Sequence, residues 1–360
     1  MARLSLLLDP TKTGRQAQDL ENKLCRLVVG QEEAIYEIVR TYQTHLAGLS
    51  PAGRPIGNFL FLGPTGSGKT RIVEATAQSL LNNPQAVIKI DCAEYQHGHE
   101  IAKLIGSPPG YLGHRETHAL LSQEELNQHH TDKMKVSIVL FDEIEKASDT
   151  LWNLLLGILD KGVLTLGDNR KVDFSSSLVF LTSNLGASEM CALSAPRLGF
   201  HCPKSEDAGF NEQLGARMSS AGVAAARRKF TPEFINRLDK IVVFKPLGHE
   251  ELRRIIDIEL AVVHQRIQTA AADKAFKVSV TESAREFLLT EGTDSRYGAR
   301  HLKRAIERLL VQPLSNLMAS GQIRRGDFVR VGHHKGSASL LFFCEAEAVW
   351  TRNLTGRAAA

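Results

Sequence analysis

The sequence has few cysteines, and their pattern disfavours a disulfide framework. Five cysteines occur in 360 residues, and no two of them have C-x-x-C spacing. An odd number of scattered thiols is more typical of a protein that stays in a reducing compartment. We therefore expect a cytoplasmic protein.

Long apolar runs and a strong net charge are missing as well. The opening run Leu4–Leu8 is too short for the apolar region of a signal peptide and meets Asp9-Pro10 at once. No other run has the roughly 20 apolar residues that a membrane-spanning helix needs. Lys and Arg number 44 against 40 Asp and Glu, which leaves a net charge of only +4. This composition favours neither a nucleic acid nor a membrane as a partner.

One Gly-rich segment carries most of the functional information. It reads G-x-x-x-x-G-K-T and directly follows the apolar run Phe59–Leu62, which is the context of a phosphate-binding P-loop. Its backbone N–H groups can face a polyphosphate, while the lysine reaches the β and γ phosphates and the threonine hydroxyl binds Mg²⁺. The alternative is a Gly-rich turn with an exposed lysine. The predicted ATP cradle consists of Gly63, Pro64, Thr65, Gly66, Ser67, Gly68, Lys69 and Thr70.

An acidic motif further along the chain supplies what a P-loop lacks. The apolar run Val136–Phe141 has the composition of a buried parallel strand and ends at Asp142-Glu143. The carboxyl ends of such strands open onto a ligand crevice. We expect Asp142 to bind Mg²⁺ together with Thr70, and Glu143 to orient or deprotonate the attacking water. The alternative is an acidic turn that caps a helix beginning near Ala147.

Strands and helices alternate up to Pro246, which predicts an α/β fold with a five-stranded parallel P-loop sheet. Apolar spacing predicts a helix over Asp149–Asp160, and Gly167-Asp168-Asn169 indicates a hairpin within Leu164–Phe174. The five expected strands are Phe59–Leu62, Ala86–Ile90, Val136–Phe141, Leu178–Thr182 and Ile241–Phe244.

Beyond Pro246 the pattern becomes helical, which predicts a smaller C-terminal domain. Its expected elements are helices over His249–Ala271, Thr281–Thr290 and Arg300–Val311 and a β hairpin formed by Asp327–Val331 and Ser339–Phe343. The stretch 187–226 is rich in Ala, Ser and Gly and reads as a variable, partly disordered loop with room for one helix. The expected organisation is an N-terminal extension at 1–25, a large ATPase domain at 26–246, a small domain at 247–346 and a tail at 347–360.

Seven blocks of sequence carry a family resemblance. They are VVGQEEAI (28–35), RPIGNFLFLGPTGSGKT (54–70), GSPPGYLG (106–113), VLFDEIEKA (139–147), KVDFSSSLVFLTSNLGA (171–187), FTPEFINRLDKIVVFKPL (230–247) and YGARHLKRAIE (297–307). In this order they resemble the second ATPase module of the Clp chaperone ATPases, the ClpA, ClpB and ClpC type of AAA+ protein. The family's N-terminal domain and first ATPase module are not seen, so the chain resembles one ring of a two-ring machine.

The resemblance implies roles for five more residues. Val28 and Val29 would flank the adenine, although two valines before a glycine also suit a core. Asn184 matches a sensor of the γ-phosphate or the lytic water, although asparagine after a strand is ordinary turn chemistry. Arg237 resembles an arginine finger that reaches a neighbouring subunit's nucleotide; its alternative is a surface arginine paired with an acid. Arg300 matches a second sensor, and its alternative is a solvated helix start.

Two further segments resemble family contacts with other proteins. Tyr111 and Leu112 match an aromatic pore loop that grips extended polypeptide in the ring's channel; the alternative is a tyrosine folded onto its own domain. After Gly113 the sequence departs from the family pattern, which puts the substrate preference in doubt. Leu198, Gly199 and Phe200 stand where ClpA- and ClpC-type proteins carry a tripeptide that docks onto the ClpP peptidase, whereas ClpB-type proteins lack it. The alternative is a chance match in which the phenylalanine packs onto its own domain.

The resemblance therefore implies an ATP- and Mg²⁺-dependent unfoldase that assembles as a homohexamer and threads protein substrates through a central pore. A ClpP-like peptidase or an adaptor is an expected further partner. The rival interpretations are a motor dedicated to one assembly, such as a secretion or contractile apparatus, and a scaffold that binds ATP but hydrolyses it slowly. A DNA-directed function would need a basic channel, which the composition does not indicate.

Overall fold

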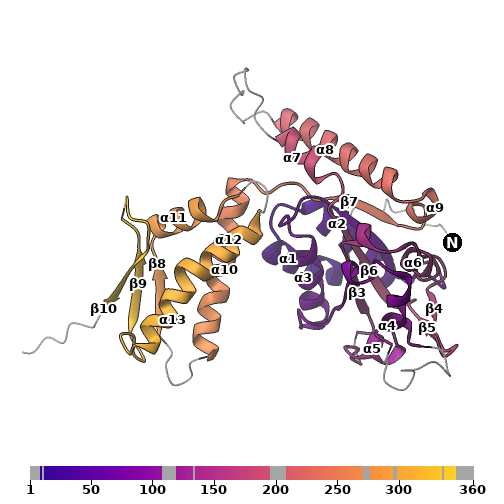
Figure 1. Ribbon diagram of the computed structural model, residues 1–360, viewed down its shortest axis with the longest axis horizontal. Coiled ribbons are helices and arrows are strands. Elements are labelled where there is room, and N and C mark those ends of the chain that lie inside the picture. The colour runs from indigo at the N-terminus through magenta and orange to yellow at the C-terminus, as the bar shows by residue number, and fades with distance from the viewer. Residues whose placement is uncertain are drawn as a thin grey trace, which may run out of the picture. The chain divides into compact units, whose positions relative to one another are not determined.

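The structure is a computed structural model of the chain (Figure 1). It falls into two compact units. The larger unit runs to Glu251, and the smaller one, apart from Gly298, takes the described residues from Leu252 onward. The described residues are 9, 12–107, 119–132, 134–194, 208–270, 276–294, 298–334 and 336–345.

A five-stranded parallel sheet forms the centre of the larger unit, as the sequence predicts. The strand order is β2-β3-β6-β1-β7, so the strand before the P-loop, β1, lies between β6 and β7. The register pairs Leu62 with Ser183 and with Val243, so the carboxyl ends of these strands meet at one edge. The strands are β1 (Gly57–Leu62), β2 (Ile88–Asp91), β3 (Ser137–Asp142), β6 (Ser177–Ser183) and β7 (Lys240–Val243).

Helices cover both faces of this sheet. Side chains alternate along β1, so Phe59 and Phe61 belong to one buried cluster, while Leu60 and Leu62 belong to the other. The rings of Phe59 and Phe180 stack with their centroids 5.2 Å apart. The phenylalanine side packs against α1 (Arg15–Leu27), α2 (Glu32–Leu46) and α3 (Lys69–Leu81), and the leucine side against α6 (Asp149–Lys161), α7 (Ala187–Ser194), α8 (Ala208–Lys229) and α9 (Pro232–Ile235).

Helix α1 lies within the segment that the sequence analysis reads as an N-terminal extension. Ala17, Leu20 and Leu24 recur at helical spacing on one face of α1 and are buried against α2 and α3. The described part of this segment therefore belongs to the core of the larger unit.

The stretch 187–226 contains helices where the sequence analysis expects a loop. In Figure 1, α7 and α8 lie side by side. The prediction of a loop with room for one helix underestimates the helical content, because alanine favours helix strongly but contributes little apolar contrast from one face to the other. The buried side of α8 is made of Met218, Ala225 and Ala226, and its last turn is basic, as the helix dipole favours.

Short elements fill the connections of the larger unit. The hairpin expected within Leu164–Phe174 is confirmed: β4 (Val163–Thr165) pairs with β5 (Lys171–Asp173), and Asn169 in the turn has φ +66°. The other short elements are η1 (Cys92–Glu94), η2 (Gly98–Ile101), α4 (Ala102–Ile105), α5 (Gln123–Asn127) and η3 (Ile144–Lys146).

The smaller unit combines helices with a three-stranded sheet of order β10-β9-β8. The expected hairpin is confirmed as β9 and β10, although β10 begins at Leu341 rather than Ser339. Strand β8, parallel to β9, is not predicted, because its few residues give only a weak alternating signal. The elements are α10 (His249–Ala270), β8 (Lys277–Val280), α11 (Glu282–Gly292), α12 (Ala299–Ile306), the π-helical turn η4 (Glu307–Val311), α13 (Gln312–Ala319), β9 (Phe328–Gly332) and β10 (Leu341–Glu345).

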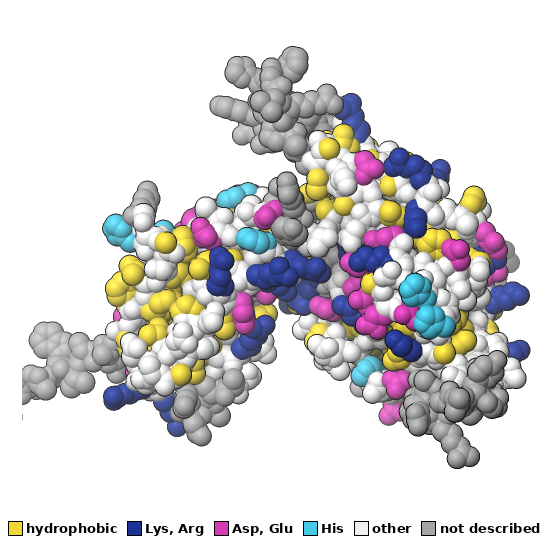
Figure 2. Space-filling view, viewed as in Figure 1, with side chains coloured by type: hydrophobic (Ala, Val, Ile, Leu, Met, Phe, Trp, Pro, Cys, Tyr) yellow, Lys and Arg dark blue, Asp and Glu magenta, His cyan; other side chains and the backbone are white. Residues whose placement is uncertain are grey.

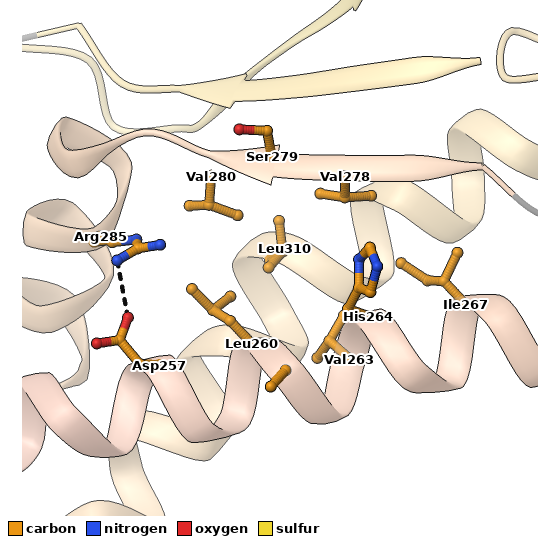
Figure 3. A pocket seen from close by; sticks show the side chains of 11 residues that line it. Asp257, Leu260, Val263, His264, Ile267, Val278, Ser279, Val280, Arg285 and Leu310 are labelled. Carbon is orange, nitrogen blue, oxygen red and sulfur yellow. Dashed lines mark hydrogen bonds and ion pairs between the residues drawn. The ribbon is translucent and has the colours of Figure 1, made fainter. Parts of the chain in front are cut away.

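A cavity of about 380 Å³ lies between α10 and β8 in this smaller unit (Figure 3). Val278 and Val280 point from the strand toward the helix, and Leu260 points back from α10. At one end, Arg285 donates a hydrogen bond of 2.9 Å to Asp257. The lining combines apolar side chains with the polar Asp257, His264, Ser279 and Arg285, and it includes none of the residues predicted to bind nucleotide.

Candidate nucleotide site

The P-loop leaves β1 at the carboxyl edge of the sheet and leads into α3. Gly63 has φ +148°, and a Cβ atom there would come within 2.6 Å of the Phe244 carbonyl oxygen on the neighbouring segment. Gly68, at the N-cap of α3, has φ +102°. The close approach requires glycine at Gly63, and the left-handed backbone favours it at Gly68. The predicted loop therefore has the backbone it needs to place N–H groups at the start of α3.

Lys69, the first residue of α3, lies inside this loop. Its side chain is 8% exposed. Its Nζ donates hydrogen bonds to the carbonyl oxygens of Gly63 (2.8 Å) and Pro64 (2.9 Å) and to Oδ1 of Asn184 (2.9 Å). The ammonium group is therefore held at the mouth of the loop by oxygen atoms, which is the position a polyphosphate needs it to have.

Asn184 joins the P-loop to the acidic motif. It directly follows β6, which lies between β1 and β3. Besides accepting from Lys69, it donates through Nδ2 to Oε1 of Glu143 at 3.4 Å, and its backbone N–H donates to Oε1 of Glu145 at 3.0 Å. The structure thus brings three predicted site residues from three segments into one polar network.

Glu143 sits in a left-handed backbone conformation, with φ 58° and ψ 47°. Such a conformation is unfavourable for a residue with a side chain and is held by its surroundings. Here the Glu143 backbone N–H donates to Oγ1 of Thr182 at 3.1 Å, and the same hydroxyl donates to the Asp142 carboxylate. Thr182 therefore fixes both acidic residues at once.

Two lysines neutralise these acids in part. Lys146 forms an ion pair with Glu143, and Lys89 lies 3.5 Å from the Asp142 carboxylate. The hydrogen bond and charge of Glu143 raise the pKa of Lys146 above its ordinary value.

Nearby Cys92 is buried, and burial together with the carboxylates around it raises the pKa of its thiol. Cys92 is therefore a protonated core residue and not a nucleophile.

Gln31 is a site residue that the sequence reasoning missed. Its amide is buried and donates to the carbonyl oxygens of Ser67 (3.1 Å) and Lys245 (3.0 Å), while its Oε1 atom accepts a hydrogen bond from the Lys245 backbone N–H (3.2 Å). It therefore ties the P-loop to the segment after β7. Its place directly after Val29-Gly30 in a family block was the available signal.

The other residues predicted to bind the nucleotide lie in several different parts of the structure. Thr70 stands in the first turn of α3, beside Lys69. Val28 and Val29 are buried, and Val28 packs in the cluster around Phe59 and Phe61, so it has a structural role whatever it does for adenine. Arg300 is exposed at the start of α12 in the smaller unit. The adenine and sensor roles of these residues stay predictions.

Arg237 lies at the opposite edge of the sheet. It precedes β7, and its carbonyl oxygen accepts a hydrogen bond from the side chain of Asn58, near the start of β1. Its guanidinium is 2.9 Å from Glu233 and 3.9 Å from Asp160, and its side chain is 25% exposed. The expected partner Glu233 is thus present. Arg237 is far from the P-loop of its own chain, which follows the other end of β1.

Two predicted sites fall outside the described residues. Tyr111 and Leu112 of the pore loop lie in the gap 108–118, and Leu198, Gly199 and Phe200 lie in the gap 195–207. Within the described part of the chain, no group of His, Cys, Asp and Glu side chains has the arrangement of a metal cluster, and no helix has the length and apolar character needed to cross a bilayer.

Comparison with protein families identifies the module. Residues 54–241 match the AAA domain (Cdc48 subfamily), and residues 247–331 match the C-terminal, D2-small domain of ClpB protein. The chain belongs to the AAA+ ATPases of the Clp type. The predicted family and fold are thereby confirmed, and membership of this family implies nucleotide binding by the AAA+ module.

Curated relatives are similar to the AAA+ module over most of its length. A chaperone protein ClpB of Rhizobium meliloti (strain 1021) is 38% identical over 312 residues, which is 87% of this chain and 33% of the relative. A chloroplastic chaperone protein ClpB2 of Oryza sativa subsp. japonica is 40% identical over 309 residues, which is 86% of this chain and 29% of the relative. The chain thus spans about a third of the length of these relatives.

Solved structures show the same fold. A closed-state cryo-electron microscopy reconstruction of Hsp104 with ATPγS and FITC casein matches with a TM-score of 0.74 and 30% identity, over 91% of this chain and 52% of that one. The S. cerevisiae Hsp104:casein complex in its extended conformation matches with a TM-score of 0.73 and 30% identity, over 88% of this chain and 50% of that one.

On the face drawn in Figure 2, acidic and basic side chains lie interspersed over the larger unit.

Proposed function

We propose that this AAA+ module hydrolyses MgATP and uses the energy to unfold or remodel protein substrates as a ring. The observation that carries the proposal is the network Lys69–Asn184–Glu143, which joins the P-loop to the acidic motif through side-chain contacts of 2.9 and 3.4 Å. Lys69 at the start of α3, Asn184 after β6 and Glu143 after β3 would supply a phosphate-binding cation, a polar sensor and a general base. That arrangement suits attack by water on a γ-phosphate.

Thr70 and Asp142 fit a magnesium ion. A hydroxyl and a carboxylate are the oxygen ligands that Mg²⁺ prefers beside a nucleotide. The Thr182 hydroxyl and Lys89 already bind the Asp142 carboxylate, so it is oriented by its neighbours. Bound Mg²⁺ would neutralise charge on the phosphates. We therefore assign Thr70 and Asp142 as its protein ligands.

Glu143 is the proposed general base. One oxygen of its carboxylate accepts from Asn184 and the other pairs with Lys146, so the group is oriented toward the residues that follow β6. In this arrangement Glu143 takes the proton of the attacking water, while Asn184 fixes the position of that water beside the phosphate. Lys69 stabilises the charge that develops on the phosphoryl oxygens.

Arg237 is proposed to act on the nucleotide of a neighbouring subunit. Asn58, which holds the Arg237 backbone, and Leu62, which precedes the P-loop, are four residues apart, or about 13 Å along the strand. The Arg237 backbone therefore lies at the end of β1 that is remote from its own phosphate site. An assembly that places this edge against the next P-loop completes each site, which supports a ring of identical subunits, proposed to be a hexamer.

Protein substrates are proposed because of the relatives. The matched Hsp104 structures contain casein, and the curated relatives are named chaperones. In this chain, Tyr111 and Leu112 are the residues proposed to grip the polypeptide. An adaptor and a ClpP-like peptidase docked at Leu198, Gly199 and Phe200 are further proposed partners, and the cytoplasm is the proposed location. The relatives named ClpB weigh against the peptidase, since proteins of that type lack the docking tripeptide.

Two variants test the nucleotide chemistry. Glu143→Gln should bind MgATP with near-native affinity but hydrolyse it on the order of a hundredfold more slowly, because the base is lost and the cradle is kept. Lys69→Ala should lose binding itself. Fluorescent-nucleotide titration and steady-state ATPase assays separate the two effects. Equal turnover in wild type and Glu143→Gln would remove Glu143 from the mechanism.

Casein then separates the proposed functions. Stimulation of ATPase activity by casein, together with capture of casein by Glu143→Gln rings in ATP, is expected of an unfoldase. A dedicated motor would ignore casein and respond to one partner. A scaffold would bind ATP and assemble while showing negligible turnover in wild type. Cosedimentation with a ClpP-like peptidase, compared between wild type and Phe200→Ala, tests the docking segment.

A further inference from the structure

Asn58 is a fully buried amide at the amino end of β1. Its Nδ2 donates to the carbonyl oxygens of Leu159 (3.0 Å) and Arg237 (3.3 Å). Its backbone N–H donates to Oδ2 of Asp239 (2.8 Å), and its backbone carbonyl oxygen accepts from the Asp239 N–H (3.0 Å). The start of β1 thus binds the Arg237 carbonyl group and the backbone and side chain of Asp239, two residues further on.

A second side chain holds the same carbonyl oxygen. Arg54 donates to it through Nη2 at 3.4 Å and lies 3.6 Å from the Asp239 carboxylate. The guanidinium of Arg237 is meanwhile flanked by Asp160, the residue after Leu159. The Asn58 amide therefore anchors both the backbone that carries the guanidinium and the helix end that lies beside it.

The chemistry of Asn58 is unusual for a residue that serves stability alone. Its Oδ1 is buried and has no hydrogen-bond partner within the described residues. A buried acceptor without a donor is costly, and an apolar side chain of similar volume would avoid the cost. What the amide does provide is two directed N–H groups, one of which points at Arg237.

We propose that Asn58 is a positioning residue for Arg237, and that it acts through Arg237 on the nucleotide of the neighbouring subunit. The inference rests on the proposed role of Arg237 between subunits. Its consequence is that a residue of β1 sets the turnover of a site in another chain while leaving the P-loop at the far end of its own strand unaffected.

The test is Asn58→Leu, which keeps the volume and removes the amide. MgATP affinity should stay within about twofold of wild type, because the P-loop is untouched, while kcat falls at least roughly tenfold through loss of the arginine's alignment. Asn58→Ser is a smaller second variant if the first does not fold. Ser137→Ala is the matched control: it loses a 2.8 Å bond to the Leu126 carbonyl near the same sheet edge and should keep its kcat.

A double-variant cycle separates positioning from general damage. Asn58→Leu/Arg237→Ala should be no slower than Arg237→Ala alone, because both changes remove one interaction. Mixing Asn58→Leu with Glu143→Gln should restore turnover, since Asn58→Leu sites then receive an intact arginine from Glu143→Gln neighbours. A native rate for Arg237→Ala would overturn the trans role and this inference with it. A slow Arg237→Ala combined with a native Asn58→Leu, or a multiplicative double variant, would overturn the role of Asn58 alone.

Discussion

Thr182→Val removes one hydroxyl group from the point where Asp142 and Glu143 meet. Thr182 is fully buried on β6, and its hydroxyl both donates to the Asp142 carboxylate and accepts the Glu143 backbone N–H. Valine has nearly the same shape but can do neither. The substitution therefore tests how strongly the fold holds its two acids in place.

The magnitude follows from what is left unpaired. A hydrogen bond to a charged group contributes about 1.5–3 kcal/mol, and a buried N–H without an acceptor costs about 1–3 kcal/mol. One atom makes both contacts, so the two figures do not add fully, and we expect a loss of about 2–4 kcal/mol in the free energy of unfolding. For a unit of this size the melting temperature should fall by roughly 5–15 °C.

The comparison variant is Thr182→Ser, which keeps the hydroxyl. Thermal unfolding followed by circular dichroism should place Thr182→Ser close to wild type and Thr182→Val well below it. At a temperature where both are folded, Thr182→Val should need more Mg²⁺ for half-maximal ATPase activity, because the Asp142 carboxylate has lost a partner that orients it. If Thr182→Val and Thr182→Ser have the same melting temperature and the same Mg²⁺ dependence of ATPase activity, the hydroxyl does not hold the two acids in place.

Three further results are expected. Tyr111→Ala should keep basal ATPase activity and assembly but lose stimulation by casein, as measured by turnover with and without casein. Native labelling with a thiol reagent, read by mass spectrometry, should modify exposed Cys25 and spare Cys92, whose burial raises the pKa of its thiol; labelling of both at one rate would contradict this. The pKa of Lys146 is raised by Glu143, so the stabilisation from this ion pair is complete below the ordinary value of 10.5 and lost as the pH rises through the folded-state pKa. Lys146→Gln should therefore show a smaller fall in the free energy of unfolding at alkaline pH than wild type, as measured by denaturant titrations at several pH values.

The sequence was sufficient for the parts of the fold that local rules determine. The P-loop and the acidic strand end are contiguous motifs, so Lys69 and Glu143 could be named from spacing alone. The sheet followed because its strands are apolar and alternate with helices. Asn184 needed the family resemblance, since asparagine after a strand is otherwise unremarkable.

The remaining features depend on contacts between distant segments. Gln31 reaches Ser67 and Lys245, and Thr182 joins two acids from another strand, so neither role is visible in local sequence. The extent of helix α8 could not be predicted for a different reason: its buried alanines give little periodic signal. The positive φ of Glu143 also could not be anticipated, because a tertiary hydrogen bond holds it.

The rigidity of strand β1 has a consequence for the order in which neighbouring subunits hydrolyse ATP. All six of its residues are buried and paired with β6, and Phe59–Leu62 are also paired with β7, so the strand is held rigidly within the sheet. One end emerges as the P-loop, and the other holds Arg237 through Asn58. In the proposed ring, β1 would connect one nucleotide site to the next, so a shift of the P-loop on phosphate release would be transmitted along the strand to the arginine of the neighbouring site. Such coupling predicts that the subunits hydrolyse ATP in succession rather than independently.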